Sequence, residues 1–122
     1  MIPEDVLQFI HSTIASVWTL ELLLLLFRNP SSSWSAESLN RELRASALVV
    51  ADGLAALTAA GLVVEESPGL YRFQPARPEI GALLHRLAEV YAEFPFAVTQ
   101  AILAAPNRKI RTFADAFRIK KD

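Results

Sequence analysis

Residues 19–30, TLELLLLLFRNP, constrain the fold more than any other stretch of this chain. After Glu21 the segment is apolar on nearly every side of a helix, and it must end at Asn29 and Pro30 because proline interrupts a helix. A helix that is apolar all round is buried. Its run of six apolar residues, 22–27, is far short of the roughly 20 that cross a membrane. We therefore expect no membrane span, and we expect this helix to lie in the middle of a core.

Length and composition predict a single core and additional apolar surface that the core does not bury. The 122 residues suit a single domain that needs neither disulfides nor a metal. Hydrophobic residues make up 52% of the chain, above the about 45–50% of typical globular proteins, and this surplus indicates a partner subunit. The absence of cysteine excludes a thiolate metal site and a thiol nucleophile and fits a cytoplasmic protein. Acidic Glu4 and Asp5, in place of a basic segment, make a secretory signal peptide unexpected.

Helical spacing of apolar residues and capping residues predict the other helices. A first helix begins at Pro3 and runs to about residue 16, and a long helix follows Pro78 until Pro95 kinks or breaks it. The helix resumes after Pro95 and ends at Pro106 and Asn107. Between these, Ser35 and Ser46 are expected to cap helices over 36–43 and 47–61. Residues 62–75 predict a β-hairpin turning at Pro68 and Gly69.

Charge is distributed unevenly along the chain. Residues 1–107 hold six Lys/Arg and eleven Asp/Glu, a balance of −5, whereas residues 108–122 hold six Lys/Arg and two Asp, a balance of +4. We therefore divide the chain into a domain, 1–107, and a basic tail, 108–122. In the tail Ile110, Phe113 and Phe117 recur at helical spacing, which predicts an amphipathic helix. Its cations are Arg108, Lys109, Arg111, Arg118, Lys120 and Lys121.

Three helices followed by a hairpin, with WSAESLNREL and LAALTAAGLV in that order, form a recognisable pattern. Over roughly residues 17–75 this pattern resembles MarR-like bacterial winged helix-turn-helix proteins of the stand-alone transcription-regulator type. The resemblance implies a mainly α fold with a small β-hairpin wing and flanking dimerisation-type helices. It further implies a homodimer, formed through the first helix and the helix after Pro78, that binds duplex DNA with the helix over 47–61.

That recognition helix lacks the chemistry expected of a DNA reader. The pattern turns Val50, Leu54 and Leu57 inward. It turns toward the groove Ser46, Ala47, Leu48, Val49, Ala51, Asp52, Ala55 and Ala56. Base edges are read mainly by hydrogen-bonding side chains, and here one hydroxyl and one acid are the only polar groups. The nearby cations that the domain offers to phosphates are Arg41, Arg44, Arg72 and Arg77.

Two functional hypotheses follow from this conflict. In the first, the protein is a transcription regulator that binds duplex DNA weakly, and the tail supplies the missing charge. In the second, the apolar face including Leu48 and Val49 binds another protein, and the chain does not read DNA. The tail has three further interpretations. It is a solvated end whose Phe113 and Phe117 pack back on the body, or it binds in a partner's groove, or it lies on an anionic membrane surface.

We expect neither an enzyme nor a cofactor. The sequence shows no acid/base pair, phosphate loop or metal cluster, and His11 and His85 lack neighbouring ligands at metal spacing. Trp18 and Trp34 are expected to pack in the core, with an effector pocket lined by Trp18, Tyr91 and Phe94 as the alternative. Gly53 lowers helix stability by about 1 kcal/mol relative to alanine, which indicates that another backbone or DNA approaches it closely.

Overall fold

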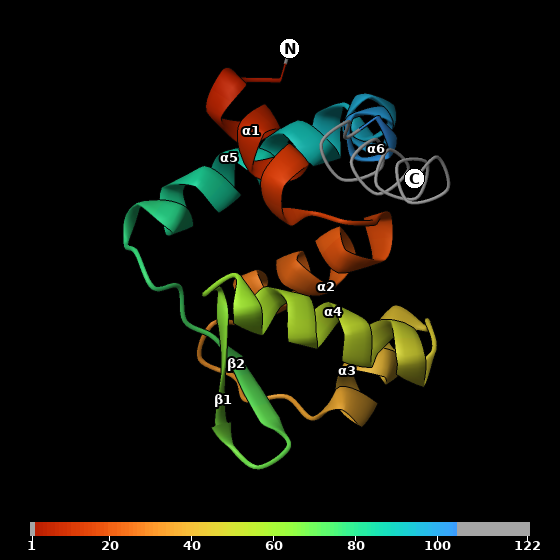
Figure 1. The fold of residues 1–122 in the computed structure, drawn as a ribbon, viewed down its shortest axis with the longest axis vertical. Coiled ribbons are helices and arrows are strands. Elements are labelled where there is room, and N and C mark those ends of the chain that lie inside the picture. The colour runs from red at the N-terminus through yellow and green to blue at the C-terminus, as the bar shows by residue number, and fades with distance from the viewer. Residues whose placement is uncertain (1, 105–122) are drawn as a thin grey trace, which may run out of the picture.

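The computed structural model describes residues 2–104, so the tail over 108–122 and the helix end expected at Pro106 and Asn107 lie outside the described residues. Within residues 2–104 the fold is mainly helical, with one small antiparallel sheet (Figure 1). The elements in chain order are α1 (Glu4–Thr13), α2 (Val17–Arg28), α3 (Ala36–Leu43), α4 (Ala47–Ala59), β1 (Val63–Ser67), β2 (Leu70–Phe73), α5 (Glu79–Glu93) and α6 (Pro95–Leu103).

Helix α2 lies in the middle of the molecule, as its composition predicts. In Figure 1, α1, α5 and α6 lie on one side of α2, and α3, α4 and the hairpin lie on the other. Five of its leucines, Leu20, Leu22, Leu23, Leu24 and Leu26, are buried. The helix begins where the Ser16 hydroxyl accepts a hydrogen bond from the Thr19 amide at 3.1 Å. Because α2 is covered on both sides, it joins the two groups of helices into one core.

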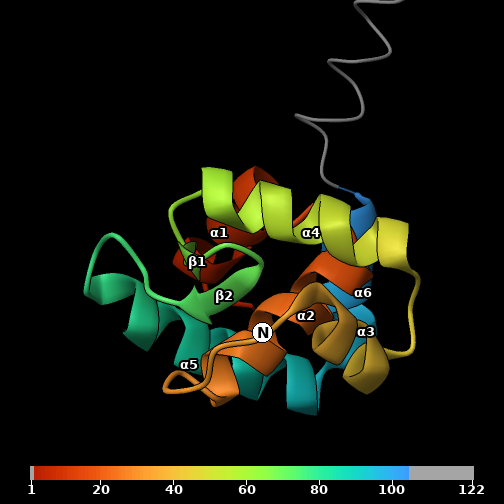
Figure 2. The ribbon, with the colours of Figure 1, turned by 90° about the horizontal axis from the view of Figure 1, so that it is seen from below.

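Helices α3 and α4 are set by two serine caps and one unusual residue between them. Ser35 and Ser38 form a reciprocal capping box at the start of α3, and the Ser46 hydroxyl accepts from the Val49 amide at 3.1 Å. Arg44, between the helices, has φ 57° and ψ 41°, a left-handed conformation that is uncommon for residues other than glycine. This turn directs α4 across the outer side of α2 (Figure 2).

Helix α4 contacts α2 closely at Gly53, which is buried. A Cβ atom at this position would lie 2.7 Å from Cδ2 of Leu22. The approach that the sequence indicated is therefore made by the central helix, and DNA is not needed to explain this glycine.

The hairpin pairs β1 with β2 in antiparallel register, with Val63 opposite Phe73. Gly69 has φ +81°, as the second central residue of a type II turn requires. On the other edge of β2, Trp34 and Tyr71 exchange two backbone hydrogen bonds of 2.8 Å. The loop after α2 therefore adds a single bridge to the small sheet.

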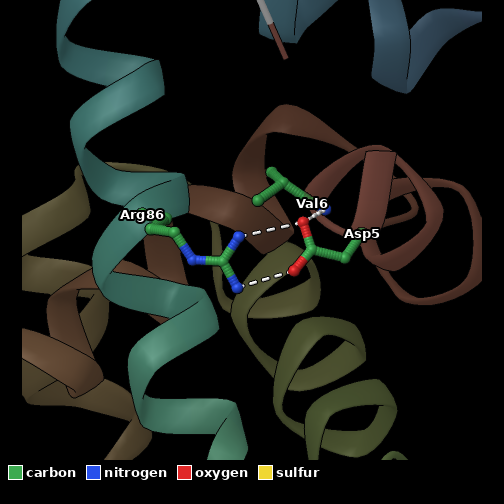
Figure 3. Close-up of polar contacts among 3 residues, drawn as sticks. All are labelled: Asp5, Val6 and Arg86. Carbon is green, nitrogen blue, oxygen red and sulfur yellow. Dashed lines mark hydrogen bonds and ion pairs between the residues drawn. The ribbon is translucent and has the colours of Figure 1, made fainter. Parts of the chain in front are cut away.

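The remaining helices pack together on α1. Helix α1 ends at Thr13, earlier than the residue 16 expected, because Ile14 is extended and Ser16 is needed to cap α2. Pro95 breaks the long helix into α5 and α6, since a proline fits the first turn of a helix but not its interior. Arg86 of α5 donates to both carboxylate oxygens of Asp5 in α1, at 2.6 and 2.9 Å (Figure 3).

Candidate binding surface on α4

Helix α4 presents an exposed, mostly apolar side to solvent. Val50, Leu54 and Leu57 are buried, as the sequence predicted. We define the α4 face as the exposed residues Ser46, Ala47, Leu48, Ala51, Asp52, Ala55 and Ala56. Leu48 retains 70% of its surface in solvent, whereas Val49 is half-buried and contributes less to this side than expected. Asp52 is the only charged residue of α4, so the face offers a partner small apolar side chains and one acid.

The start of α4 is electrostatically different from the rest of the face. The first-turn amides of a helix have no intrahelical acceptors, and the helix dipole is positive at that end. Arg41 and Arg44 lie just before it; both are exposed, and within residues 2–104 neither forms an ion pair. The start of α4 therefore favours an anion through its free amides and through two nearby arginines that form no ion pair within residues 2–104.

Arg44 is held where glycine would be more stable. A left-handed backbone destabilises a residue with a Cβ by about 1–2 kcal/mol. The turn between α3 and α4 therefore has a strained backbone at a position that carries a positively charged side chain.

The hairpin does not add free positive charge to this surface. Nε of Arg72 lies 3.2 Å from a carboxylate oxygen of Glu66, and Nη2 donates to the side chain of Gln74 at 3.1 Å. Glu66 also accepts from the Ser33 hydroxyl. Arg77 lies 3.7 Å from Glu79. Two of the cations that the sequence offered to DNA are therefore paired with acids.

The structure thus brings together part of the predicted site. Arg41, Arg44, Ser46, Ala47 and Leu48 lie at one end of α4. Arg72 lies on β2 and bonds within the hairpin. The predicted site residues Arg108, Lys109, Arg111, Arg118, Lys120 and Lys121 are outside the described residues.

A cleft of about 490 Å³ between α1, α5 and the turn after α4 was not predicted. The Asp5–Arg86 pair contributes to its lining, together with Phe9, Gly61 and Leu83. The hydrogen bonds from Arg86 lower the pKa of Asp5, and the bonded carboxylate raises the pKa of Arg86. The pair joins residues 81 positions apart, so no local pattern in the sequence could reveal it.

A second groove lies between the start of α2 and the end of α3. Its volume is about 330 Å³, and it is lined by Val17, Trp18, Glu21, Glu42 and Leu43. Trp18 is 43% exposed, so the expectation that it packs in the core was wrong. The reason is its place at the open end of α2, beyond the part of the helix that other elements surround.

Glu21 connects this groove to α5. The Tyr91 hydroxyl donates to Oε2 of Glu21 at 2.6 Å. Burial, followed by this hydrogen bond to a carboxylate, raises the pKa of Tyr91 to about 12. Tyr91 therefore supports a groove residue and does not itself line the groove, contrary to the predicted effector pocket.

Residues 2–104 contain no cluster of the usual metal ligands. Within them no three His, Cys, Asp or Glu side chains gather as a metal site would require. His85 is exposed and lies 3.5 Å from Glu89 on the same helix. No single helix in this range has the length and apolar character to cross a membrane; α1 and α2 meet that condition only jointly, with a bend of 112° between them.

Comparison with known proteins adds no relative. No protein-family model, curated protein or solved structure matched the chain.

Proposed function

We propose that this protein is a non-enzymatic winged-helix protein of the transcription-regulator type, which binds duplex DNA weakly through the start of α4 with help from its basic tail. The observation that carries the proposal is the placement of Arg41 and Arg44 beside the exposed amino end of α4. In this reading α3 and α4 form the helix-turn-helix, α4 is the recognition helix and the β1–β2 hairpin is the wing.

The arrangement of elements supports this reading. Helix α4 lies along an outer edge of the molecule (Figure 2), with its inner side on α2 and its outer side free within the described domain. The amides and cations at its start suit phosphate oxygens, which helix amino ends bind readily. Alanine and leucine on the rest of the face suit the methyl groups of thymine. Such a surface would hold DNA in place while reading little of its sequence.

Net charge explains why the tail is needed. Residues 1–107 carry −5 and therefore repel a polyanion on average. Six cations in the tail offset this repulsion. Because phosphate neutralisation releases counterions, the affinity should fall steeply with salt.

The test is a titration of fluorescently labelled duplex DNA, followed by anisotropy, over a series of salt concentrations. The double variant Arg41→Gln and Arg44→Gln should reduce the salt slope by about 2, since each lost phosphate contact reduces it by about 1. Replacing the six tail cations with glutamine should reduce it further. The variant Arg77→Gln is the charge-matched control for Arg44→Gln alone, because Arg77 is paired with Glu79 in the cleft beside α1, and it should leave the slope unchanged.

Two outcomes would contradict the DNA proposal. One is the absence of binding by the full chain at low salt. The other is an equal effect of Arg77→Gln and of Arg44→Gln, which would mean that only net charge matters.

A second function is favoured by Leu48, which exposes 70% of its surface on a face whose only charge is Asp52. Exposed apolar clusters commonly bind proteins. The variant Leu48→Arg separates the two functions: it should strengthen DNA binding in the first and displace a protein partner in the second. Affinity for duplex DNA and quantitative co-purification from the source cells, each compared with the unaltered chain, would decide between them.

A further inference from the structure

The groove between α2 and α3 combines an aromatic surface with negative charge. Trp18 contributes exposed aromatic surface, and Val17 and Leu43 are half-buried around it. Glu21 and Glu42 supply two carboxylates. Within residues 2–104 no Lys or Arg side chain lines this groove.

Both carboxylates retain capacity to bind a cation. Tyr91 uses Oε2 of Glu21, and a carboxylate has several further acceptor positions. Glu42 is exposed and forms no ion pair with any residue in the described range. Cations also bind favourably over the face of an indole ring. The complementary occupant is therefore a segment with several positive charges and large apolar side chains.

The chain's own C-terminal segment has this composition. Residues 108–122 carry a balance of +4 together with Ile110, Phe113 and Phe117. The described chain ends just after α6, and Figures 1 and 2 both place α6 on the same side of the molecule as the start of α2. Five residues, 105–109, separate Ala104 from Ile110, and the six Cα-to-Cα steps between them span up to roughly 20 Å when extended. The segment therefore has the charge and the apolar side chains that complement the groove, and it leaves α6 on the groove's side of the molecule.

We propose that residues 108–122 dock in this groove of their own chain. Phe113 and Phe117 pack against Trp18 and Leu43, and the basic side chains pair with Glu21 and Glu42. The docking does not require DNA. Leu43 lies at the groove and is followed directly by Arg44, so a docked segment places its remaining cations beside the start of α4. The docking thereby deepens the proposed function, and in that respect it rests on it.

Crosslinking of the full chain tests the docking directly. The three lysines of this protein, Lys109, Lys120 and Lys121, all lie in the C-terminal segment. A zero-length carbodiimide reagent joins a lysine amine to a carboxylate that touches it, so each lysine crosslink found by mass spectrometry reports where the segment lies. We expect crosslinks to Glu21 or Glu42. Crosslinks confined to other acids, such as Glu65 and Glu66, or no lysine crosslinks, would overturn the proposal.

A mixture of isotope-labelled and unlabelled protein identifies the chain to which the segment binds. Docking within one chain joins only peptides with the same label. Peptide pairs with mixed labels would show that the segment binds a second copy, and would overturn the assignment to its own chain.

Fluorescence gives an independent measurement on the full chain. Trp34→Phe leaves Trp18 as the single tryptophan, and acrylamide, which is uncharged, then reports its exposure. Glu42→Lys should increase the quenching of Trp18, as should the pair Phe113→Ser and Phe117→Ser. Glu37→Lys is the matched control, because it reverses an equal charge at the opposite end of α3. Equal quenching in Glu37→Lys and Glu42→Lys would contradict the docking.

The docking and the DNA proposal can fail separately. Lysine crosslinks to Glu42 in a chain that binds no DNA would retain the docking and remove the DNA function. DNA binding that depends on the tail cations, without such crosslinks, would retain the DNA function and remove the docking.

Discussion

At the scale of single residues, Arg44 places a positive charge at a position where glycine would make the folded protein more stable. Its φ of 57° lies in a region that glycine enters without steric penalty. Arg44→Gly should therefore stabilise the protein by roughly 0.5–1 kcal/mol, after the greater flexibility of glycine in the unfolded chain is taken into account. A higher urea midpoint is the expected observation, together with weaker DNA binding.

The control for Arg44→Gly is Arg41→Gly. Arg41 lies inside α3, where glycine destabilises a helix by about 1 kcal/mol. A lower midpoint in both variants would mean that the Arg44 side chain stabilises the turn by contacts of its own.

At Gly53 we expect the opposite effect, a loss of stability when the residue is replaced. A Cβ at this position would be 2.7 Å from Leu22, whose own side chain is fully packed in the core. Overpacking destabilises the folded protein by about 1–3 kcal/mol, and the better helix propensity of alanine offsets about 1 kcal/mol of this loss. Gly53→Ala should thus lower stability by up to about 2 kcal/mol in chemical denaturation.

Gly81 supplies the comparison for Gly53. It also lies inside a helix, but a Cβ there would meet no atom within 4 Å. Gly81→Ala should raise stability by up to about 1 kcal/mol. If both substitutions stabilise, the contact between α2 and α4 is looser than the structure shows.

At the scale of elements, the Tyr91–Glu21 hydrogen bond joins α5 to α2. The pKa of Tyr91 is about 12 in the native state, above the ordinary value of 10.0, so folding holds the phenolic proton more tightly. The stability from this bond is therefore fully present below pH 10 and is lost as the pH rises toward 12. Tyr91→Phe should lower stability by about 1 kcal/mol at neutral pH.

The pH dependence of that difference checks the assignment. Urea denaturation of both proteins between pH 8 and the highest pH at which they fold should show the gap between them narrowing above pH 10. The comparison also removes the contribution of Tyr71, which both proteins contain. A stability difference that does not change with pH would mean that Tyr91 stabilises the protein through packing of its ring and not through the hydrogen bond to Glu21.

The elements themselves were largely predictable because their signals are local. Ser35, Ser46 and Pro95 each determine a helix boundary by chemistry that acts within one turn. The central position of α2 followed from its lack of a polar side. Its open end was not recognised, which is why Trp18 was wrongly expected in the core.

Contacts between distant residues were not predictable from one sequence. The Asp5–Arg86 pair, the Tyr91–Glu21 bond and the Trp34–Tyr71 bridge leave no periodic pattern. They depend on how the helices are arranged in space. The cleft beside the Asp5–Arg86 pair and the groove beside Glu21 were missed for the same reason, whereas the mostly apolar outer side of α4 could be inferred from helical spacing.

At the scale of the whole molecule, apolar surface remains exposed on α6. Phe96 is 75% exposed and Leu103 is 54% exposed, which agrees with the surplus of hydrophobic residues in the composition. We expect the protein to form a homodimer, with this helix contributing to the interface. Phe96→Glu should then shift the protein toward the monomer in sedimentation velocity, with Gln100→Glu, also exposed on α6, as the control for added charge. A monomer in the unaltered protein at all concentrations would contradict this expectation.

The bridge between Trp34 and Tyr71 has a consequence for aggregation. An unprotected strand edge is a template on which other chains can add strands and grow into fibrils. Here the loop after α2 occupies the outer edge of β2, and the opposite strand carries two adjacent glutamates, Glu65 and Glu66. The bridge thus occupies part of the outer edge of β2, and Glu65, which forms no ion pair within residues 2–104, puts negative charge on the other strand. Both features oppose the addition of further strands to this small sheet.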